Sequence, residues 1–310
     1  MGGWFPSSVI VAPAPVPAAS PCPATNQLNA LQACGWPNSL NTGYIPTGVS
    51  LTTYTGSTTI APNTTLDSFH FTSSLTVGAN VRFTRCWFDL PQTTNCRDFF
   101  APDCPCTSLT CAGCTPHDWV VLSGVGTGAN GLFFTDCEFS GGYGGINGDN
   151  TSGDITILRC NFHNSGENFV TLPSGTISCT DSYFHDYNND CHTGGHCQIF
   201  RSQTIPTVGL TLRHNTMNGK PTDAANGGQS LCFMKPDFGT GTLGNVTVDN
   251  CLLAGTVNTY VQVIGAGLIG TVHVTNNRVG RDFGQSYFDL RDGTITVSGN
   301  VFDNDGTPAP

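Results

Sequence analysis

An eight-residue pattern that recurs along most of the chain is the feature that most limits what this sequence can fold into. The pattern reads apolar, any residue, apolar, two mostly polar residues, Cys or Asn, any residue, apolar. Its starts lie 51, 23, 22, 33, 36, 26 and 23 residues apart, so the basal period is 22–26 residues. A fixed period of this size is typical of stacked coils that bury a shared core. The eight copies are VRFTRCWF from Val81, LFFTDCEF from Leu132, ITILRCNF from Ile155, ISCTDSYF from Ile177, LTLRHNTM from Leu210, VTVDNCLL from Val246, VHVTNNRV from Val272 and ITVSGNVF from Ile295.

A second apolar patch follows most of these octets, as at 169–172, 198–200 and 261–264. Each coil therefore offers at least two short strands joined by turns rich in Gly, Asn and Asp. A leucine-rich repeat has a similar period, but it needs a helical or Leu-rich return segment, which this sequence lacks. We predict an all-β fold, a right-handed parallel β-helix (solenoid) with a short Pro-rich N-terminal arm and Cys-rich loop insertions.

The predicted organisation has three parts. Residues 1–42 form a Pro/Ala-rich N-terminal arm or attachment segment, in which residues 26–34 suit one short helix. Residues 43–303 form the parallel β-helix, and residues 304–310 form a tail. The longer intervals between octets are insertions, which in repeat proteins form loops on one face, and that face often binds.

Charge and hydropathy exclude several classes of function. The chain carries 21 Asp and Glu against 11 Lys and Arg, a net charge of −10, whereas a nucleic-acid binder neutralises phosphates with cations. No apolar run approaches the roughly 18 residues that a membrane span needs. Residues 1–10 contain no Lys or Arg, so the basic region of a secretory signal is missing. We expect either a signal that was removed or a protein that reaches the outside by another route, as virion proteins do on lysis.

The 15 cysteines fall into two groups. Those in the octets, such as Cys86, Cys137 and Cys160, occupy one column of a stacked fold and are predicted to be packing residues in the core. Those in loops and in the arm are predicted to form disulfides, with Cys22–Cys34 pinning the arm. No cofactor is predicted, because disulfides are favoured over zinc as the explanation of the Cys-rich insertion. The zinc alternative would use Cys104, Cys106, Cys111, Cys114 and His117.

Polar side chains gather just past the octets of two neighbouring coils. His163 and His185 occupy equivalent positions, one strand spacing apart, and Asn164 and Asp186 follow them in the same way. Imidazoles beside carboxylates suit either acid–base chemistry or sugar binding. The weak catalytic candidates are His185, Asp186, Asp190, His192 and His196. The predicted ligand-binding residues are Tyr143, His163, Glu167, His185, Asp186, Tyr187, Asp190, His192 and His196.

Two enzyme classes on this fold share part of the pattern. Pectin-type glycoside hydrolases carry N-x-D, D-D, G-H-G and R-x-K motifs. Here Asn188-Asn189-Asp190 and Gly195-His196 are partial echoes, with no D-D or R-x-K. Pectate-lyase-like enzymes need an Asp cluster for calcium facing a basic residue. Arg201 and Arg213 are available, but no cluster of Asp shares their column. A polysaccharide lyase or glycoside hydrolase therefore stays an alternative, and the interpretation leans away from an enzyme.

From Asn41 onward the chain resembles a β-helix repeat family found in actinobacterial secreted proteins and in phages of those bacteria. The resemblance covers residues 41–303 and is carried by the run NTGYIPTGVSLTTYTG, by the coil ANVRFTRCWF, and by GGYGGINGDN, FHDY and HTGGHCQ. Many relatives have His-Thr-Asp-Gly where this chain has His192-Thr193-Gly194-Gly195. That departure removes a carboxylate from the loop best placed to react.

The resemblance implies a virion surface protein of a bacteriophage, a minor tail or spike-like structural protein that presents a rigid β-helix to host envelope glycans. The expected partners are other virion proteins, tail or capsid, through residues 1–42, and a host surface glycan, with a homo-oligomer left open. The expected location is the virion, with a secreted extracellular protein as the alternative. A third alternative is a decoration protein of capsid or tail that binds no ligand.

Overall fold

In the computed structural model, the described part of the chain is almost entirely β. It comprises residues 21–90, 119–123, 131–142, 144–148, 153–165, 168–171, 175–186, 198–202, 209–219, 228–234, 244–264, 270–281, 286–291 and 293–310. Only two short 3-10 helices occur in these ranges, η1 (Gln27–Ala30) and η2 (Ile45–Thr47), and both precede the first strand.

The strands form three parallel sheets, here named A, B and C. Sheet A contains β1 (Thr52–Thr53), β4 (Phe69–Phe71), β7 (Trp87–Asp89), β10 (Glu138–Ser140), β13 (Asn161–His163), β16 (Tyr183–His185), β19 (Thr216–Asn218), β22 (Leu252–Ala254), β25 (Arg278–Val279) and β28 (Val301–Phe302). Sheet B contains β2 (Thr59–Ile60), β5 (Leu75–Val77), β8 (Trp119–Ser123), β11 (Gly144–Asn147), β14 (Asn168–Thr171), β17 (Gln198–Ser202), β20 (Gly228–Met234), β23 (Thr256–Val263) and β26 (Ser286–Leu290). Sheet C contains β3 (Thr65–Asp67), β6 (Val81–Thr84), β9 (Leu132–Thr135), β12 (Ile155–Leu158), β15 (Thr176–Thr180), β18 (Gly209–Arg213), β21 (Asn245–Asp249), β24 (Thr271–Thr275) and β27 (Thr294–Ser298).

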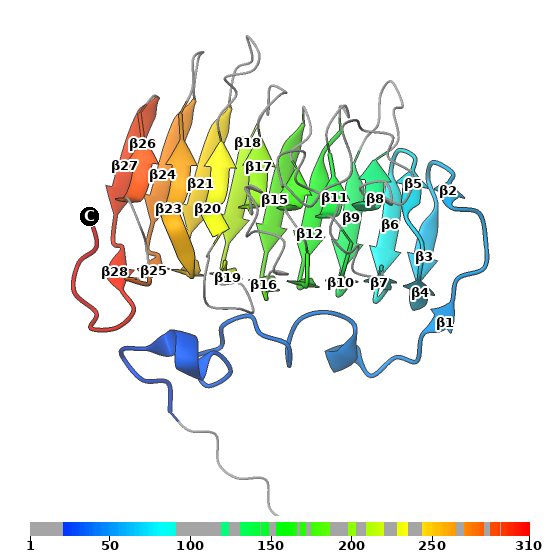
Figure 1. The fold of residues 1–310 in the computed structure, drawn as a ribbon, viewed down its shortest axis with the longest axis horizontal. Helices are drawn as coiled ribbons and strands as arrows, with labels where there is room; N and C mark the ends of the chain where they lie inside the picture. The colour runs from blue at the N-terminus through cyan, green and yellow to red at the C-terminus, as the bar shows by residue number, and fades with distance from the viewer. Residues whose placement is uncertain are drawn as a thin grey trace, which may run out of the picture.

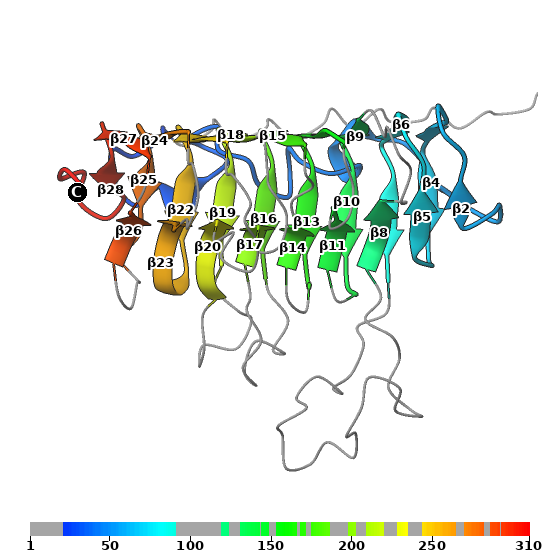
Figure 2. The same ribbon diagram turned by 90° about the horizontal axis from the view of Figure 1, so that it is seen from above.

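Each sheet takes every third strand, so one circuit of the chain adds one strand to each sheet. The strands are stacked side by side along one long axis (Figures 1 and 2). The predicted all-β class is confirmed, and the stacked parallel sheets are consistent with a parallel β-helix solenoid. The sequence predicted at least two strands per coil. The structure has three, because each octet spans a sheet C strand and a sheet A strand.

The octet is divided at its fifth position by a residue in the left-handed backbone conformation. This bend turns the chain from sheet C into sheet A, and its side chains stack from coil to coil. Arg159 Nε lies 2.7 Å from Asp136 Oδ1, and His214 Nδ1 lies 2.6 Å from Asp181 Oδ1. Polar side-chain contacts between coils, one of them an ion pair, therefore accompany these left-handed turns. The bend residues, with φ of 50–69°, are Arg85, Asp136, Arg159, Asp181, His214, Asn250, Asn276 and Gly299.

Phenylalanine rings form a continuous stack inside sheet A. The ring of Phe139 lies 4.6 Å from Phe88 and 4.3 Å from Phe162, centroid to centroid, with interplanar angles of 12° and 1°. The stack continues from Phe88 to Phe71 and from Phe162 to Phe184. The octet produces this ladder because its eighth position always points inward, and stacked aromatic rings add to the burial energy.

The sixth octet position is buried in every coil, as the sequence predicted. Cys86, Cys137, Cys160 and Cys251 are fully buried free thiols, and burial raises the pKa of Cys251 to about 12. Asparagines in the same column form hydrogen bonds between coils. For example, the backbone N–H of Cys251 donates to Asn277 Oδ1 at 2.8 Å. The residues at the sixth octet position therefore stabilise the fold by packing in the core and by hydrogen bonds between coils.

Residues 21–50, here called the strap, run along the outside of sheet A from its last coils back to its first (Figure 1). Near its start, a disulfide joins Cys22 to Cys34, as predicted. Trp36 then stacks on His214 at 5.1 Å, and the N–H of Gly43 donates to the carbonyl of Arg159 at 2.9 Å. The described part of the predicted arm is therefore packed on the body of its own chain.

Candidate functional site

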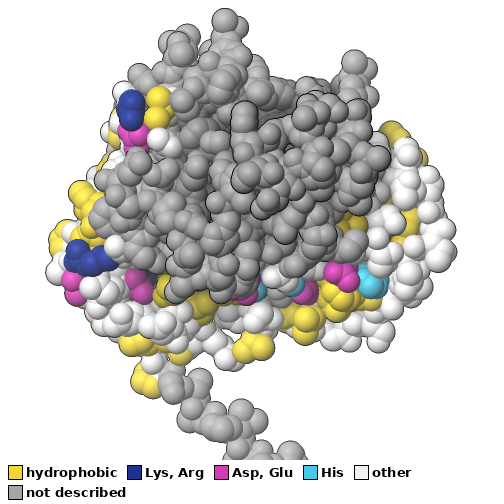
Figure 3. Space-filling model, viewed as in Figure 1, with side chains coloured by type: hydrophobic (Ala, Val, Ile, Leu, Met, Phe, Trp, Pro, Cys, Tyr) yellow, Lys and Arg dark blue, Asp and Glu magenta, His cyan; other side chains and the backbone are white. Residues whose placement is uncertain are grey.

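The outward side chains of sheet A carry several titratable groups in neighbouring coils. In each three-residue strand the middle residue faces the core, so the first and third face outward. The third position holds His163 in β13 and His185 in β16, which are register partners, as the sequence predicted. Figure 3, which has the view of Figure 1, shows acidic and histidine side chains in a row along the lower part of the molecule.

His163 is held in one tautomer. Its Nδ1 lies 2.9 Å from the amide nitrogen of Asn164, which donates, so Nδ1 accepts. The proton therefore resides on Nε2, which donates to Glu138 Oε1 at 2.9 Å in the preceding coil. Both nitrogens of the ring are therefore occupied, and the ring links Asn164 to the carboxylate of Glu138.

His185 has oxygen atoms at both ring nitrogens. Nδ1 lies 2.6 Å from Asp186 Oδ2, and Nε2 lies 3.1 Å from Asn161 Oδ1. Both ring nitrogens therefore have polar partners, one in the same turn and one in the preceding coil. The hydrogen bond from His185 lowers the pKa of Asp186 below its usual range.

Ring stacking fixes the orientation of the two histidines. Their centroids lie 5.3 Å apart, and the ring of Tyr183 lies 4.0 Å from that of His185. Burial, with a further contribution from the charge of Asp186, raises the pKa of Tyr183 to about 12. The phenol is therefore neutral across the physiological range and acts as a flat platform.

The strap passes over the outward side chains of sheet A at Gly43, beside Glu138 of β10. Glu138 is 6% exposed, and its Oε2 has no hydrogen-bond partner. Gly43 has a φ of +78°, and a Cβ there would lie 3.1 Å from Asn161 Cβ and 3.3 Å from Glu138 Oε2. Only glycine lets the strap pass this close to the carboxylate. Burial raises the pKa of the adjacent Tyr44, and the charges of Glu138 and then Asp89 add to the effect.

An aromatic cluster continues the row toward the first coils. Trp87 stacks on His70 at 4.3 Å and on Tyr44 at 5.9 Å. Its indole N–H donates to Ser140 Oγ at 3.0 Å, and that hydroxyl donates to Asp89 Oδ1 at 2.9 Å. Asp89 keeps 38% of its side chain exposed, so an acidic group beside a tryptophan faces solvent here.

Of the residues predicted for the site, the structure brings together His163, His185 and Asp186. Trp87, Glu138 and Tyr183 were missed, although they share octet position seven, which also faces outward. A comparison of the seventh residue of each octet would have identified them. Tyr44 precedes the first octet, so the repeat gives no indication of its role. The remaining predicted residues lie outside the described part of the chain: Tyr143, Glu167, Tyr187, Asp190, His192 and His196, together with the zinc candidates Cys104, Cys106, Cys111, Cys114 and His117.

The arrangement favours binding over acid–base chemistry in the described residues. Each nitrogen of His163 and His185 already has a partner, so neither is aimed at an incoming substrate. Among the described residues, no group of three or more His, Cys, Asp or Glu is placed to hold a metal ion. What the row offers a ligand is an exposed carboxylate at each end, at Asp89 and Asp186, with flat rings between them.

Among the described residues, no helix is long and apolar enough to cross a membrane. Comparison of the chain with protein-family models, with curated proteins and with solved structures finds no match.

Proposed function

We propose that this protein is a structural virion surface protein, a minor tail or spike-like component. In this proposal its coil is a right-handed parallel β-helix, the hand of nearly all parallel crossover connections, and it presents sheet A to glycans of the host envelope. One observation carries the proposal: part-exposed aromatic and acidic side chains lie on the outside of sheet A on either side of the strap, Trp87 and Asp89 in β7, and Tyr183 in β16 with Asp186 directly after it.

A row of this kind suits an extended polysaccharide. Successive coils lie about 4.8 Å apart, so they offer similar groups at regular steps to a polymer of similar units. Aromatic faces pack on the apolar faces of sugar rings, and carboxylates accept hydrogen bonds from sugar hydroxyls. The stacked Phe and Asn columns make the platform rigid, so little order has to be gained on binding.

The Cys22–Cys34 disulfide supports a location outside the reducing cytosol, which suits both a virion and a secreted protein. The contact with other virion proteins through residues 1–42 stays a proposal, and in it residues 21–42 would meet the partner while packed on sheet A of their own chain.

The test measures binding of the full chain to immobilised envelope polysaccharides from actinobacteria. His185→Ala removes the partner that holds Asp186, and we expect affinity to fall by about tenfold or more. The matched control is His273→Ala, a histidine at an outward position of β24 in sheet C, which should bind like the wild type. Equal affinity of His185→Ala and His273→Ala, at unchanged stability, would contradict the assignment of the row.

Two further readouts separate the alternatives. New reducing or unsaturated ends in the polysaccharide would favour a secreted lyase or hydrolase over a binding protein. Immunogold labelling of purified virions from the source culture tests the location: gold on particles supports the virion assignment, and protein found only free in the medium contradicts it.

A further inference from the structure

Beneath the strap, two buried polar atoms of sheet A are left without partners. His70, Trp87 and Glu138 are register partners in the neighbouring strands β4, β7 and β10, so their side chains form one outward column. Among the described residues, neither Glu138 Oε2 nor His70 Nε2 has a hydrogen-bond partner, and His70 Nε2 comes no closer than 3.5 Å to Asp89 Oδ2. Burial of polar atoms without partners destabilises the arrangement that buries them.

The strap lies over this column but does not satisfy it. A Cβ at Gly43 would lie 3.3 Å from Glu138 Oε2, so the backbone of the strap passes directly over that oxygen. The ring of Tyr44 stacks on Trp87 at 5.9 Å, with an interplanar angle of 21°. An aromatic ring flanked by two unsatisfied polar atoms is therefore covered by a segment that supplies the stacking contact and not the hydrogen bonds.

The strap is held at each side of this place. At its start, the backbone N–H groups of Gln27 and Leu28 donate to the carboxylate of Asp303 at 2.9 and 3.0 Å, a contact here called the clamp. After its end, the N–H of Thr52 in β1 donates to the carbonyl of Ser68 at 3.0 Å. Any movement of the strap between these two points therefore leaves its ends in place.

Residues 44–50 are held less firmly. Their hydrogen bonds in the described structure are internal, such as that from the N–H of Gly48 to the carbonyl of Ile45 at 3.1 Å. Gly43 and Gly48 have φ of +78° and +71°, and glycine changes its backbone conformation at little steric cost. The hydrogen bond that ties this part of the strap to sheet A is the one from Gly43 to the carbonyl of Arg159.

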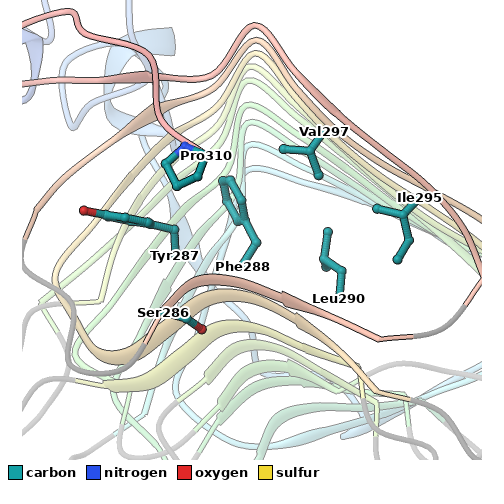
Figure 4. A pocket seen from close by; sticks show the side chains of 7 residues that line it. All are labelled: Ser286, Tyr287, Phe288, Leu290, Ile295, Val297 and Pro310. Carbon is teal, nitrogen blue, oxygen red and sulfur yellow. The ribbon is translucent and has the colours of Figure 1, made fainter.

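A cavity elsewhere in the described structure is of a different chemical kind. It has a volume of about 480 Å³ and lies beside β26 and β27 (Figure 4). Its lining is mainly apolar and includes Phe288, Leu290, Ile295 and Val297. Such a lining offers few partners to a ligand with many hydroxyl groups, whereas the column beneath the strap offers both a ring and polar atoms.

We propose that His70, Trp87 and Glu138 form a sugar-binding subsite that the strap covers, and that residues 43–50 move aside when a sugar residue enters. The apolar face of the sugar ring then takes the place of Tyr44 on Trp87. Its hydroxyls donate to Glu138 Oε2 and form a hydrogen bond with His70 Nε2, because a hydroxyl both donates and accepts. The inference rests on the proposed glycan binding and adds a subsite to the surface that is already exposed.

Binding of the full chain to immobilised envelope polysaccharides from actinobacteria tests the subsite. Tyr44→Ala removes the ring that competes for Trp87, so we expect affinity to rise about tenfold. The double variant Tyr44→Ala with Trp87→Ala should lose this gain. The matched control is Leu40→Ala, which truncates a 63% exposed apolar side chain of the strap outside residues 43–50 and should bind like the wild type.

Hydrogen–deuterium exchange of the unmodified chain gives a second measurement that needs no variant. When polysaccharide is added to the wild type, we expect the amides of residues 44–50 to exchange about tenfold faster, because the strap is displaced. The amides of Gln27 and Leu28 in the clamp should exchange at an unchanged rate.

Tighter binding by Tyr44→Ala, together with faster exchange of residues 44–50 in bound wild type, supports the covered subsite. Suppose instead that the wild type binds, residues 44–50 exchange as before, and Tyr44→Ala binds no more tightly than Leu40→Ala. The subsite is then overturned, while the proposed function still stands on the comparison of His185→Ala with His273→Ala. Absence of binding by both the wild type and Tyr44→Ala overturns the subsite and the proposed glycan binding together.

Discussion

Asn277, one of the asparagines at the sixth octet position, allows a specific prediction about stability. Its side chain is fully buried, accepts the N–H of Cys251 at 2.8 Å, and donates to the carbonyl of Val248 and to Asn300 Oδ1, both at 3.0 Å. Asn300 Oδ1 keeps a second donor, the backbone N–H of Asn277. Asn277→Ala therefore leaves the buried N–H of Cys251 without its acceptor, and it removes one of the donors to the carbonyl of Val248, which lies in β21 paired with β24.

An orphaned buried group costs about 1–3 kcal/mol and a lost hydrogen bond about 1 kcal/mol, so we expect Asn277→Ala to lower the free energy of unfolding by about 3 kcal/mol. The space left by the amide also contributes to such a loss. Asn277→Cys separates the two effects, because Cys fills the same column in four other coils but its sulfur is a weak acceptor. If hydrogen bonding dominates, Asn277→Cys is destabilised nearly as much as Asn277→Ala.

Urea unfolding followed by circular dichroism gives the stabilities, and hydrogen exchange locates the change at β21 and β24. Thr296→Ala, an exposed position on β27, is the control and should lie within about 0.5 kcal/mol of the wild type. A loss below about 1 kcal/mol in Asn277→Ala, or a Cys variant as stable as the wild type, would refute the reasoning.

Three further predictions follow from other parts of the structure. Phe162→Ala interrupts the aromatic stack and should cost about 3–5 kcal/mol, measured by urea unfolding; a loss below about 1 kcal/mol would contradict a continuous core. The double variant Cys22→Ser with Cys34→Ser should cost the strap about 3 kcal/mol, seen as faster exchange of residues 26–36 with the coils unchanged; equal exchange would show that the disulfide is not needed to hold it. Asp186 has a folded pKa below its unfolded value of about 3.9, so its contribution to stability is complete above about pH 4 and is lost as the pH falls through the folded value. His185→Ala should remove this acid-sensitive contribution, and a melting-temperature profile from pH 5 to pH 2 unchanged from the wild type would contradict it.

The repeat predicted those features of the fold that equivalent octet positions share from coil to coil. Once the octets are aligned, the burial of Cys137, the hydrogen bonding of Asn277 and the pairing of His163 with His185 follow from equivalence between coils. The bend at octet position five was visible in the same alignment as a run of Asp, Asn, His, Arg and Gly, but it was not interpreted as a boundary. The prediction of at least two strands per coil therefore did not specify the third, which the bend separates within the octet.

Contacts outside the repeat had no such signal. The approach of Gly43 to Glu138 joins a non-repeating segment to one coil, and nothing in the local sequence of either partner specifies the other. The clamp between Leu28 and Asp303 spans 275 residues and uses backbone N–H groups, which every residue except proline has. Position in the chain therefore gave no indication that the predicted arm packs on sheet A.

The clamp at Asp303 also affects the order in which the molecule assembles on the ribosome. The segment that needs this carboxylate is made first and the carboxylate is made nearly last. At about 5–20 residues per second, the two are separated by roughly 14–55 seconds of synthesis. During that interval the coils can stack one by one from β1 onward, since each contacts only its neighbours. A nascent chain that stops short of residue 303 lacks the acceptor for Gln27 and Leu28, so this end of the strap docks after the contacts at Gly43 and Trp36 can already have formed.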